Sequence, residues 1–119
     1  MPRVKRGVTA HRRHKKVLAL TKGHRATKHS LYRRAHESML KSLSYAYRHR
    51  RERKGDMRRL WILRVNAASR AQGLTYGQLM DGLRKSGVEI NRKMLADMAV
   101  REPEAFADLA TIAKGEVQG

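Results

Sequence analysis

Residues 25–54 read RATKHSLYRRAHESMLKSLSYAYRHRRERK, a stretch without a proline or a glycine. Because these two residue types disfavour helix interiors most strongly, the stretch predicts one continuous helix, about 45 Å long at 1.5 Å per residue. Its apolar residues follow helical spacing, at Tyr32, Ala35, Met39, Leu43, Ala46 and Tyr47. The apolar stripe is narrow and basic residues flank it, so we expect this helix to be stabilised mainly by a partner.

The positive charge of the chain lies in its first half. Residues 1–59 carry 20 Lys or Arg against three acids, a net charge of +17, whereas residues 60–119 carry eight against seven, a net charge of +1, and the two sum to +18. At this density, neighbouring charges are closer together than the Debye length of about 8 Å at physiological salt, so screening by salt does not remove their repulsion. Nucleic acid, with its row of phosphates, is the counterion that the first half predicts.

The remaining composition narrows the class of protein. A chain of 119 residues has room for one domain plus an extension. It has no cysteine, which excludes disulfides and thiolate metal sites. No apolar run approaches the roughly 18 residues of a membrane span, and residues 1–16 lack the hydrophobic stretch of a signal peptide. We therefore expect a cytoplasmic protein with no membrane partner.

Helix-start and helix-stop residues divide the first half further. Residues 1–8 have no periodicity and are expected to be an arm that is disordered until bound. Thr9 is a plausible N-cap for a helix over residues 10–20, which Gly23 would end. Gly55 and Asp56 predict a boundary or kink, with Asp56 capping a helix over residues 57–72.

The second half has the signals of a packed helical domain. Thr75 with Gln78 forms a predicted capping box, and Leu74 with Leu79 a hydrophobic staple. Asn91 is the next predicted cap. Further apolar residues recur with helical spacing and are expected to face the core. They are Tyr76, Met80 and Leu83, then Met94, Leu95 and Met98, and finally Phe106, Leu109, Ile112 and Ala113. Pro103 predicts the start of the last helix and Gly115 its end.

No segment alternates as a strand does, so the predicted fold class is all-α. It comprises a long basic N-terminal helical extension, with an RNA-penetrating arm and long helix over residues 1–59, and a small compact C-terminal helical domain over residues 60–119. At about sixty residues, this domain is near the lower limit for independent stability.

The basic residues are the strongest candidates for phosphate contact, since acids are too few to pair with them. With Tyr47 as a stacking residue, the candidate RNA-binding set is Arg3, Lys5, Arg6, Arg12, Arg13, Lys15, Lys16, Lys22, Arg25, Arg33, Arg34, Tyr47, Arg48, Arg50, Arg51, Arg53, Lys54, Arg58, Arg59, Arg92 and Lys93. At 100° per residue the cations between residues 50 and 54 point around the helix. Charge on all sides favours an arm threaded between segments of folded RNA over one that meets a single duplex groove.

Two members of this set lie at a helix start. Arg92 and Lys93 follow the Asn91 cap, where the helix dipole disfavours cations unless an anion is bound. They are the predicted RNA contacts of the second half. Two cations at this position could also be tolerated without an anion if their long side chains extend into water. Arg84 and Lys85 lie at a predicted helix C-terminus, where a favourable interaction with the helix dipole is sufficient to explain two cations.

The aromatic residues have both stacking and packing interpretations. Tyr32, Tyr45, Tyr47 and Trp61 could stack on bases. Tyr45 and Tyr47 lie about 200° apart on a helix, so one of them is expected to meet the partner. Trp61 lies among apolar residues, where a core or hinge role is favoured.

Catalysis and cofactor binding find little support. The six histidines all lie in residues 1–59, and His11 with His14 has helical spacing, but without Cys or a nearby acid a metal site is not expected. Glu104 and Asp108 are more simply a solubility feature than an acid–base pair. The sequence has no phosphate-binding glycine loop, nucleophile elbow or HExxH motif. We expect no enzyme, no cofactor and no small-molecule substrate.

The stretch KGDMRRLWILRVNAASR at residues 54–70 resembles the signature of the bacterial large-subunit ribosomal protein family numbered twenty. Further segments resemble the same family, namely PRVKRGV at 2–8, HKKVL at 14–18, KGHR at 22–25, YAYRHRRERK at 45–54 and GVEINRKMLADMAV at 87–100. His24 and Met57 differ from the family pattern, in which an aromatic residue is common at both positions.

The resemblance implies a structural constituent of the large ribosomal subunit that binds large-subunit ribosomal RNA and promotes early subunit assembly. Its partners would be that RNA, neighbouring large-subunit ribosomal proteins and, through translational autoregulation, its own messenger RNA. The alternatives are a nucleoid DNA-compacting protein, which would bind any duplex, and a membrane-active cationic helix, which would need a broader apolar face.

Overall fold

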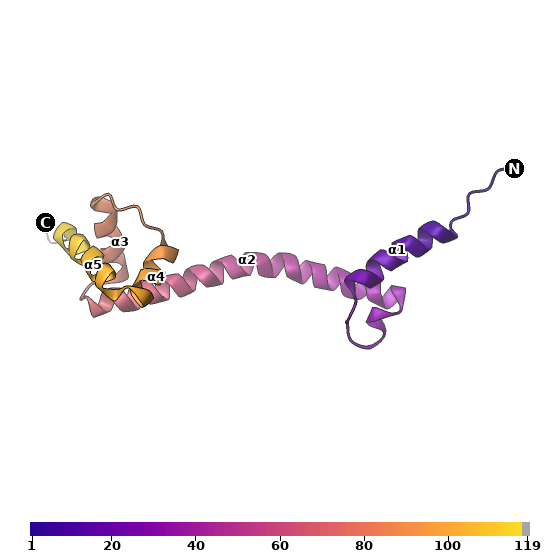
Figure 1. Cartoon of the computed structure of the whole chain (residues 1–119), viewed down its shortest axis with the longest axis horizontal. Coiled ribbons are helices and arrows are strands. Elements are labelled where there is room, and N and C mark those ends of the chain that lie inside the picture. The colour runs from indigo at the N-terminus through magenta and orange to yellow at the C-terminus, as the bar shows by residue number, and fades with distance from the viewer. Residues whose placement is uncertain (118–119) are drawn as a thin grey trace. The chain divides into compact units, whose positions relative to one another are not determined.

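Helices make up most of residues 1–117, the part of the chain that this structure, a computed structural model, describes (Figure 1). The elements in chain order are α1 (Gly7–Leu20), the 3₁₀ helix η1 (Ala26–His29), α2 (Tyr32–Ala71), α3 (Tyr76–Lys85), α4 (Arg92–Arg101) and α5 (Pro103–Val117). No strand occurs within these residues, so the predicted all-α fold is confirmed.

The chain divides into two compact units. Unit 1 is Met1–Arg51 and unit 2 is Glu52–Gly119. Unit 1 carries 16 Lys or Arg and one acid, a net charge of +15, and unit 2 carries 12 against nine, a net charge of +3. The charge asymmetry of the sequence is therefore also an asymmetry between the two units.

The first helix of unit 1 begins before the predicted cap. α1 starts at Gly7 with Arg6 at the cap position, and no side chain caps it. Thr9 lies in the first turn, where its hydroxyl donates to the Arg6 carbonyl at 2.9 Å, so the predicted cap at Thr9 is wrong. The predicted end at residue 20 is confirmed, and Thr21 is fully buried with its hydroxyl donating to the Val17 carbonyl at 3.2 Å.

The long helix α2 differs from prediction at its start and in its middle. It begins at Tyr32, not residue 25, because Ala26 has a φ of +58°, outside the right-handed α region, and residues 26–29 form the separate 3₁₀ helix η1. No break occurs at Gly55, and Asp56 lies inside α2 and pairs with Arg59 at 3.4 Å instead of capping a new helix. A glycine costs a helix only about 1 kcal/mol, which the residues on either side offset.

Unit 2 begins its helices as predicted. The Thr75 hydroxyl accepts from the Gln78 amide N–H at 3.3 Å, and the Gln78 side chain accepts from the Thr75 amide at 2.9 Å, which confirms the capping box. Asn91 caps α4 by accepting from the Met94 amide at 2.9 Å. Pro103 begins α5, but α5 continues through Gly115 to Val117, so the predicted end at Gly115 is wrong.

Glycines in left-handed backbone end two helices of unit 2. Gly73 follows α2 with a φ of +79°, and Gly87 follows α3 with a φ of +72°. The amide of Leu74 donates to the Ser69 carbonyl at 2.9 Å, and that of Val88 donates to the Leu83 carbonyl at 2.9 Å. These are Schellman motifs, which satisfy the last carbonyls of each helix.

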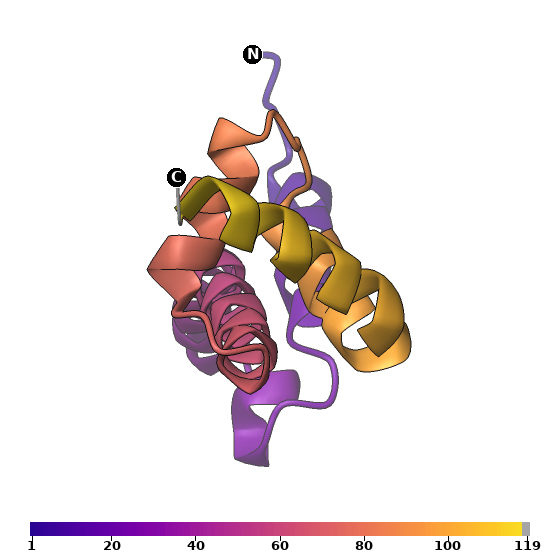
Figure 2. The same cartoon turned by 90° about the vertical axis from the view of Figure 1, so that its left-hand side faces the viewer.

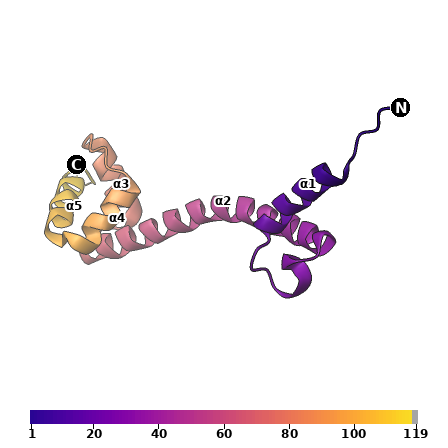
Figure 3. The ribbon, with the colours of Figure 1, turned by 45° about the vertical axis from the view of Figure 1, so that its right-hand side comes forward.

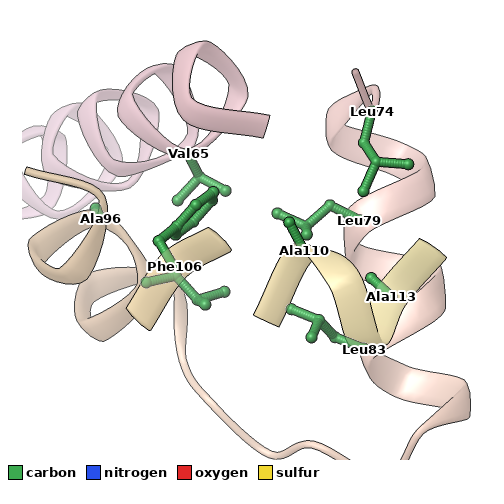
Figure 4. Close-up of a cluster of buried hydrophobic side chains, with 9 residues drawn as sticks. Val65, Leu74, Leu79, Leu83, Ala96, Phe106, Ala110 and Ala113 are labelled. Carbon is green, nitrogen blue, oxygen red and sulfur yellow. The ribbon is translucent and has the colours of Figure 1, made fainter. Parts of the chain in front are cut away.

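The core of unit 2 lies between the last turns of α2 and the helices α3, α4 and α5 (Figures 2 and 3). Phe106 from α5 points toward Val65 from α2, and Leu79 and Leu83 of α3 lie opposite α5 (Figure 4). α3 and α5 pack closely, since a Cβ atom on Gly82 would lie 2.5 Å from the Ala113 carbonyl oxygen.

The buried faces of α4 and α5 are only partly as predicted. Met94 is 54% exposed and Ile112 is 47% exposed, so both core predictions are wrong. Ala96 and Ala110 are buried in their place. On α5 the buried residues Phe106, Ala110 and Ala113 are spaced at i, i+4 and i+7 and share one face, on which Ile112 does not lie. Leu95, Phe106 and Ala113 are buried as predicted.

Candidate nucleic-acid interface

The cations that the sequence predicts in unit 1 all lie on its surface. The exposed members of the predicted set are Arg3, Lys5, Arg6, Arg12, Arg13, Lys15, Lys16, Lys22, Arg25, Arg33, Arg34, Arg48, Arg50 and Arg51. Glu37, the one acid of unit 1, pairs with Arg34 at 3.7 Å, and both side chains are largely exposed. One carboxylate cannot neutralise sixteen cations, so the surface of unit 1 has a strong positive potential.

The predicted cations of the second half of α2 are also exposed. The surface of α2 exposes Arg53, Lys54, Arg58 and Arg59. Among these four, only Arg59 has an acid partner within residues 1–117, Asp56 at 3.4 Å. Exposed pairs of this kind contribute little to folding. These charges are therefore better explained by a partner than by folding.

The tyrosines of unit 1 have different surroundings. Tyr32 is half-buried and stacks on His14, with 3.7 Å between ring centroids. Tyr47 is 55% exposed, and the Arg51 guanidinium lies 3.5 Å from its ring centroid. Tyr45 is also exposed, near the Lys41 ammonium at 5.3 Å. Tyr45 also stacks on His49, with 5.5 Å between ring centroids, so all three tyrosines have a partner within the chain. Tyr45 and Tyr47 differ from Tyr32 in that they are exposed.

A basic pocket in unit 1 includes residues that the candidate set lacks. It has a volume of about 520 Å³, and Lys28, Lys41 and Tyr45 line it together with Arg34 and Glu37. Lys28 comes from η1, and the others from α2. The sequence could not indicate this grouping, because it depends on the turn that follows α1.

Two adjoining pockets of unit 2 share Trp61, Asn91 and Lys93 in their walls. One, of about 420 Å³, also includes Arg64 and Asp97, and the other, of about 250 Å³, also includes Arg58 and Arg92. We call the two together the Trp61 pocket. Arg64 is absent from the predicted set, although its position three residues after Trp61 puts both on one side of α2.

Arg92 is held in place beside this pocket. Its side chain is half-buried, and its Nε donates to the Tyr76 hydroxyl at 2.8 Å. The terminal nitrogens of the guanidinium have no acid partner among the described residues. The one acid in the pocket wall, Asp97, pairs with Arg101 at 3.1 Å. The structure therefore brings Arg58, Arg92 and Lys93 of the predicted set together, and adds Trp61, Arg64 and Tyr76.

Trp61 is only partly buried and packs against the core cluster, which confirms the predicted core contact.

Glu104 and Asp108 are exposed on α5. None of the helices within residues 1–117 has the length and apolar character of a membrane span.

The fold and the surface define a strongly basic, predominantly helical protein with cations exposed along its first half. The family model described as "Ribosomal protein L20" matches residues 3–109. The chain is 66% identical over 110 residues to the large ribosomal subunit protein bL20 of Dehalococcoides mccartyi, an alignment that covers 92% of each chain. It is 60% identical over 114 residues to bL20 of Moorella thermoacetica (96% of this chain, 94% of the relative) and 57% identical over 117 residues to bL20 of Natranaerobius thermophilus (98% and 100%).

The chain belongs to the ribosomal protein L20 family. This confirms the resemblance found in the sequence. The family consists of structural proteins of the large ribosomal subunit and not of enzymes. Membership implies ribosomal RNA and neighbouring ribosomal proteins as partners and a location in the ribosome.

Proposed function

We propose that this chain binds large-subunit ribosomal RNA directly and promotes early assembly of the subunit. The observation that carries the proposal is the exposed and largely unpaired positive charge of residues 1–59, a net +17 with three acids. Contact with phosphates releases their counterions, which is the main source of affinity for a surface of this kind. Family membership supports ribosomal RNA as the source of those phosphates.

The two halves of the chain are proposed to contribute differently. Residues 1–59 act as the arm that neutralises phosphates from several RNA segments. Residues 60–119 act as the domain that recognises a defined RNA site. The Trp61 pocket supports the second role, because it combines an aromatic ring with Arg64, Arg92 and Lys93 on a unit that has its own core.

The test is a binding series with the whole chain and large-subunit ribosomal RNA, with scrambled RNA and duplex DNA as competitors, across a range of salt concentrations. As the salt concentration rises, we expect binding to ribosomal RNA to persist after binding to scrambled RNA and duplex DNA is lost. Salt weakens phosphate contacts in all three nucleic acids, whereas contacts to the bases of a specific site are less affected. Equal, salt-sensitive binding to all three nucleic acids would contradict the proposal and favour a DNA-compacting protein.

The assembly role needs a separate measurement. Large-subunit reconstitution from ribosomal RNA and purified proteins should stall at an early particle when this chain is left out, and late addition should restore the subunit slowly. Unchanged kinetics without the chain would argue against the role in assembly.

We also propose that the chain binds its own messenger RNA and represses its translation. The proposal rests on the family resemblance and on the pocket of unit 2, which could accept a messenger site that mimics the ribosomal one. The messenger leader should compete with ribosomal RNA for the whole chain, and a reporter fused to that leader should fall when the protein is in excess. A leader that fails to compete would contradict the proposal.

A further inference from the structure

Trp61 has two environments in unit 2. Its side chain packs against the buried cluster that includes Val65 and Phe106, and it also lines both parts of the Trp61 pocket. A tryptophan needed only for the core could be covered completely by the helices around it. The side chain instead remains partly accessible beside an open surface hollow of about 420 Å³.

The walls of the pocket have an excess of positive charge. Arg58, Arg64 and Lys93 are exposed and have no acid partner within residues 1–117. Asp97, the one acid present, is already paired with Arg101 at 3.1 Å. An aromatic ring beside unpaired cations matches a nucleotide, whose base has an aromatic face and whose phosphate is negative.

Arg92 is the cation with a fixed orientation. The bond of 2.8 Å from its Nε to the Tyr76 hydroxyl restrains the side chain, and the Tyr76 ring packs against the core. The two terminal nitrogens keep the fork geometry that suits a phosphate. Tyr76 thus connects Arg92 of α4 to α3 and to the core cluster of unit 2.

We propose that the Trp61 pocket binds one unpaired nucleotide of RNA. The base stacks on Trp61, Arg92 and Lys93 contact its phosphates, and Tyr76 is a positioning residue that orients Arg92. The inference rests on the proposed function, since it assigns to one site the recognition of RNA by unit 2. A base inside a duplex is covered by its neighbours, so the ligand is a nucleotide of a loop, bulge or junction.

The chain offers a direct test because Trp61 is its single tryptophan. Tryptophan emission, excited at a wavelength that the four tyrosines do not absorb, therefore reports this site even while cations elsewhere bind RNA. The chain is titrated to saturation with a short oligoadenylate, with an RNA duplex of the same length, and with an abasic oligomer that has the same number of phosphates. Anisotropy of a dye on each nucleic acid measures total binding in parallel.

We expect all three nucleic acids to bind and only the oligoadenylate to quench Trp61 strongly. Tyr76→Phe keeps the ring and removes the hydroxyl, so the midpoint of the quenching titration should move to roughly three- to tenfold higher RNA concentration. Thermal unfolding of this variant, followed by circular dichroism, should stay cooperative. Arg92→Lys keeps the positive charge but is not expected to bind RNA as the unchanged chain does, because lysine lacks the fork geometry of arginine.

Saturated binding of oligoadenylate without a change in Trp61 fluorescence would overturn the inference and leave the proposed function intact. Equal quenching by the abasic oligomer or the duplex would also overturn it, since no base would then be needed. An unchanged midpoint in Tyr76→Phe would remove Tyr76 from the site. Failure of the whole chain to bind ribosomal RNA would instead contradict the proposed function.

Discussion

Single residues determine where the helices of unit 2 begin and end. Thr75 and Asn91 each accept a backbone N–H from the first turn that follows, and Gly73 and Gly87 adopt the left-handed backbone that ends a helix. Each of these interactions joins residues no more than about five positions apart. They could be predicted from the sequence because the partners are near neighbours in the chain.

The capping box of α3 should be measurable as stability. Thr75→Ala removes the hydroxyl that accepts from Gln78, and we expect the free energy of unfolding of unit 2 to fall by about 1 kcal/mol. Urea unfolding followed by Trp61 fluorescence measures this change. Thr9→Ala is the matched control, since Thr9 caps nothing and lies in unit 1, and its unfolding curve should overlay that of the unchanged chain.

Arg92 and Lys93 are the residues of unit 2 with the clearest predicted role in RNA binding. Replacing both by Ala should weaken the affinity for the ribosomal RNA fragment and lower the salt slope of binding by roughly 1 to 2, since each phosphate that is no longer neutralised lowers the slope by about 1. Lys85→Ala is a suitable control, because Lys85 pairs with Asp81 at 3.0 Å. Unaltered affinity of the double variant, with its helicity retained, would contradict the assignment.

At the scale of whole elements, two glycines inside helices have opposite surroundings. Gly55 lies within α2 with no heavy atom within 4 Å of a Cβ placed on it, whereas the same atom on Gly82 of α3 would meet the backbone of Ala113. The first glycine is therefore a local cost to its helix. The second permits α3 and α5 to approach closely.

The same substitution should have opposite effects at these two positions. Gly55→Ala is expected to raise helicity and to stabilise α2 by up to roughly 1 kcal/mol. Gly82→Ala should destabilise unit 2 by roughly 1 to 3 kcal/mol, because α3 and α5 must move apart. Circular dichroism during thermal unfolding measures both changes. A loss of stability in Gly55→Ala would show that α2 needs the glycine for a bend.

At the scale of the whole molecule, charge and core are separated along the chain. Unit 1 has a net charge of +15 and its fully buried residues are Ala35 and Thr21, whereas unit 2 has a net charge of +3 and a cluster of nine buried residues. Dense like charge opposes compaction. A polyanion that neutralises unit 1 should therefore stabilise its helices as well as bind them.

Salt dependence should report this division. Replacing Arg50, Arg53 and Lys54 by Gln should lower the slope of log affinity against log salt by roughly 2, at about 0.7 for each phosphate of a single strand. The control replaces Lys85 and Arg101, whose partners are Asp81 and Asp97, and should leave the slope nearly unchanged. Equal changes in the two variants would show that the exposed cations of α2 have no particular role in binding.

The sequence by itself determined the fold class, the charge asymmetry, the family and the caps at Thr75 and Asn91, because each depends on composition or on near neighbours. Tertiary structure decided which apolar side chains are buried. On α5 the buried face is the one with Phe106, Ala110 and Ala113, and Ile112 points about 100° or more away from each of them. The continuity of α2 through Gly55 depends on the summed helix preference of the residues on either side, which offsets the cost of one glycine. The grouping of Trp61 with Tyr76 and Arg92 depends on contacts between residues far apart in the chain, which local sequence signals do not include.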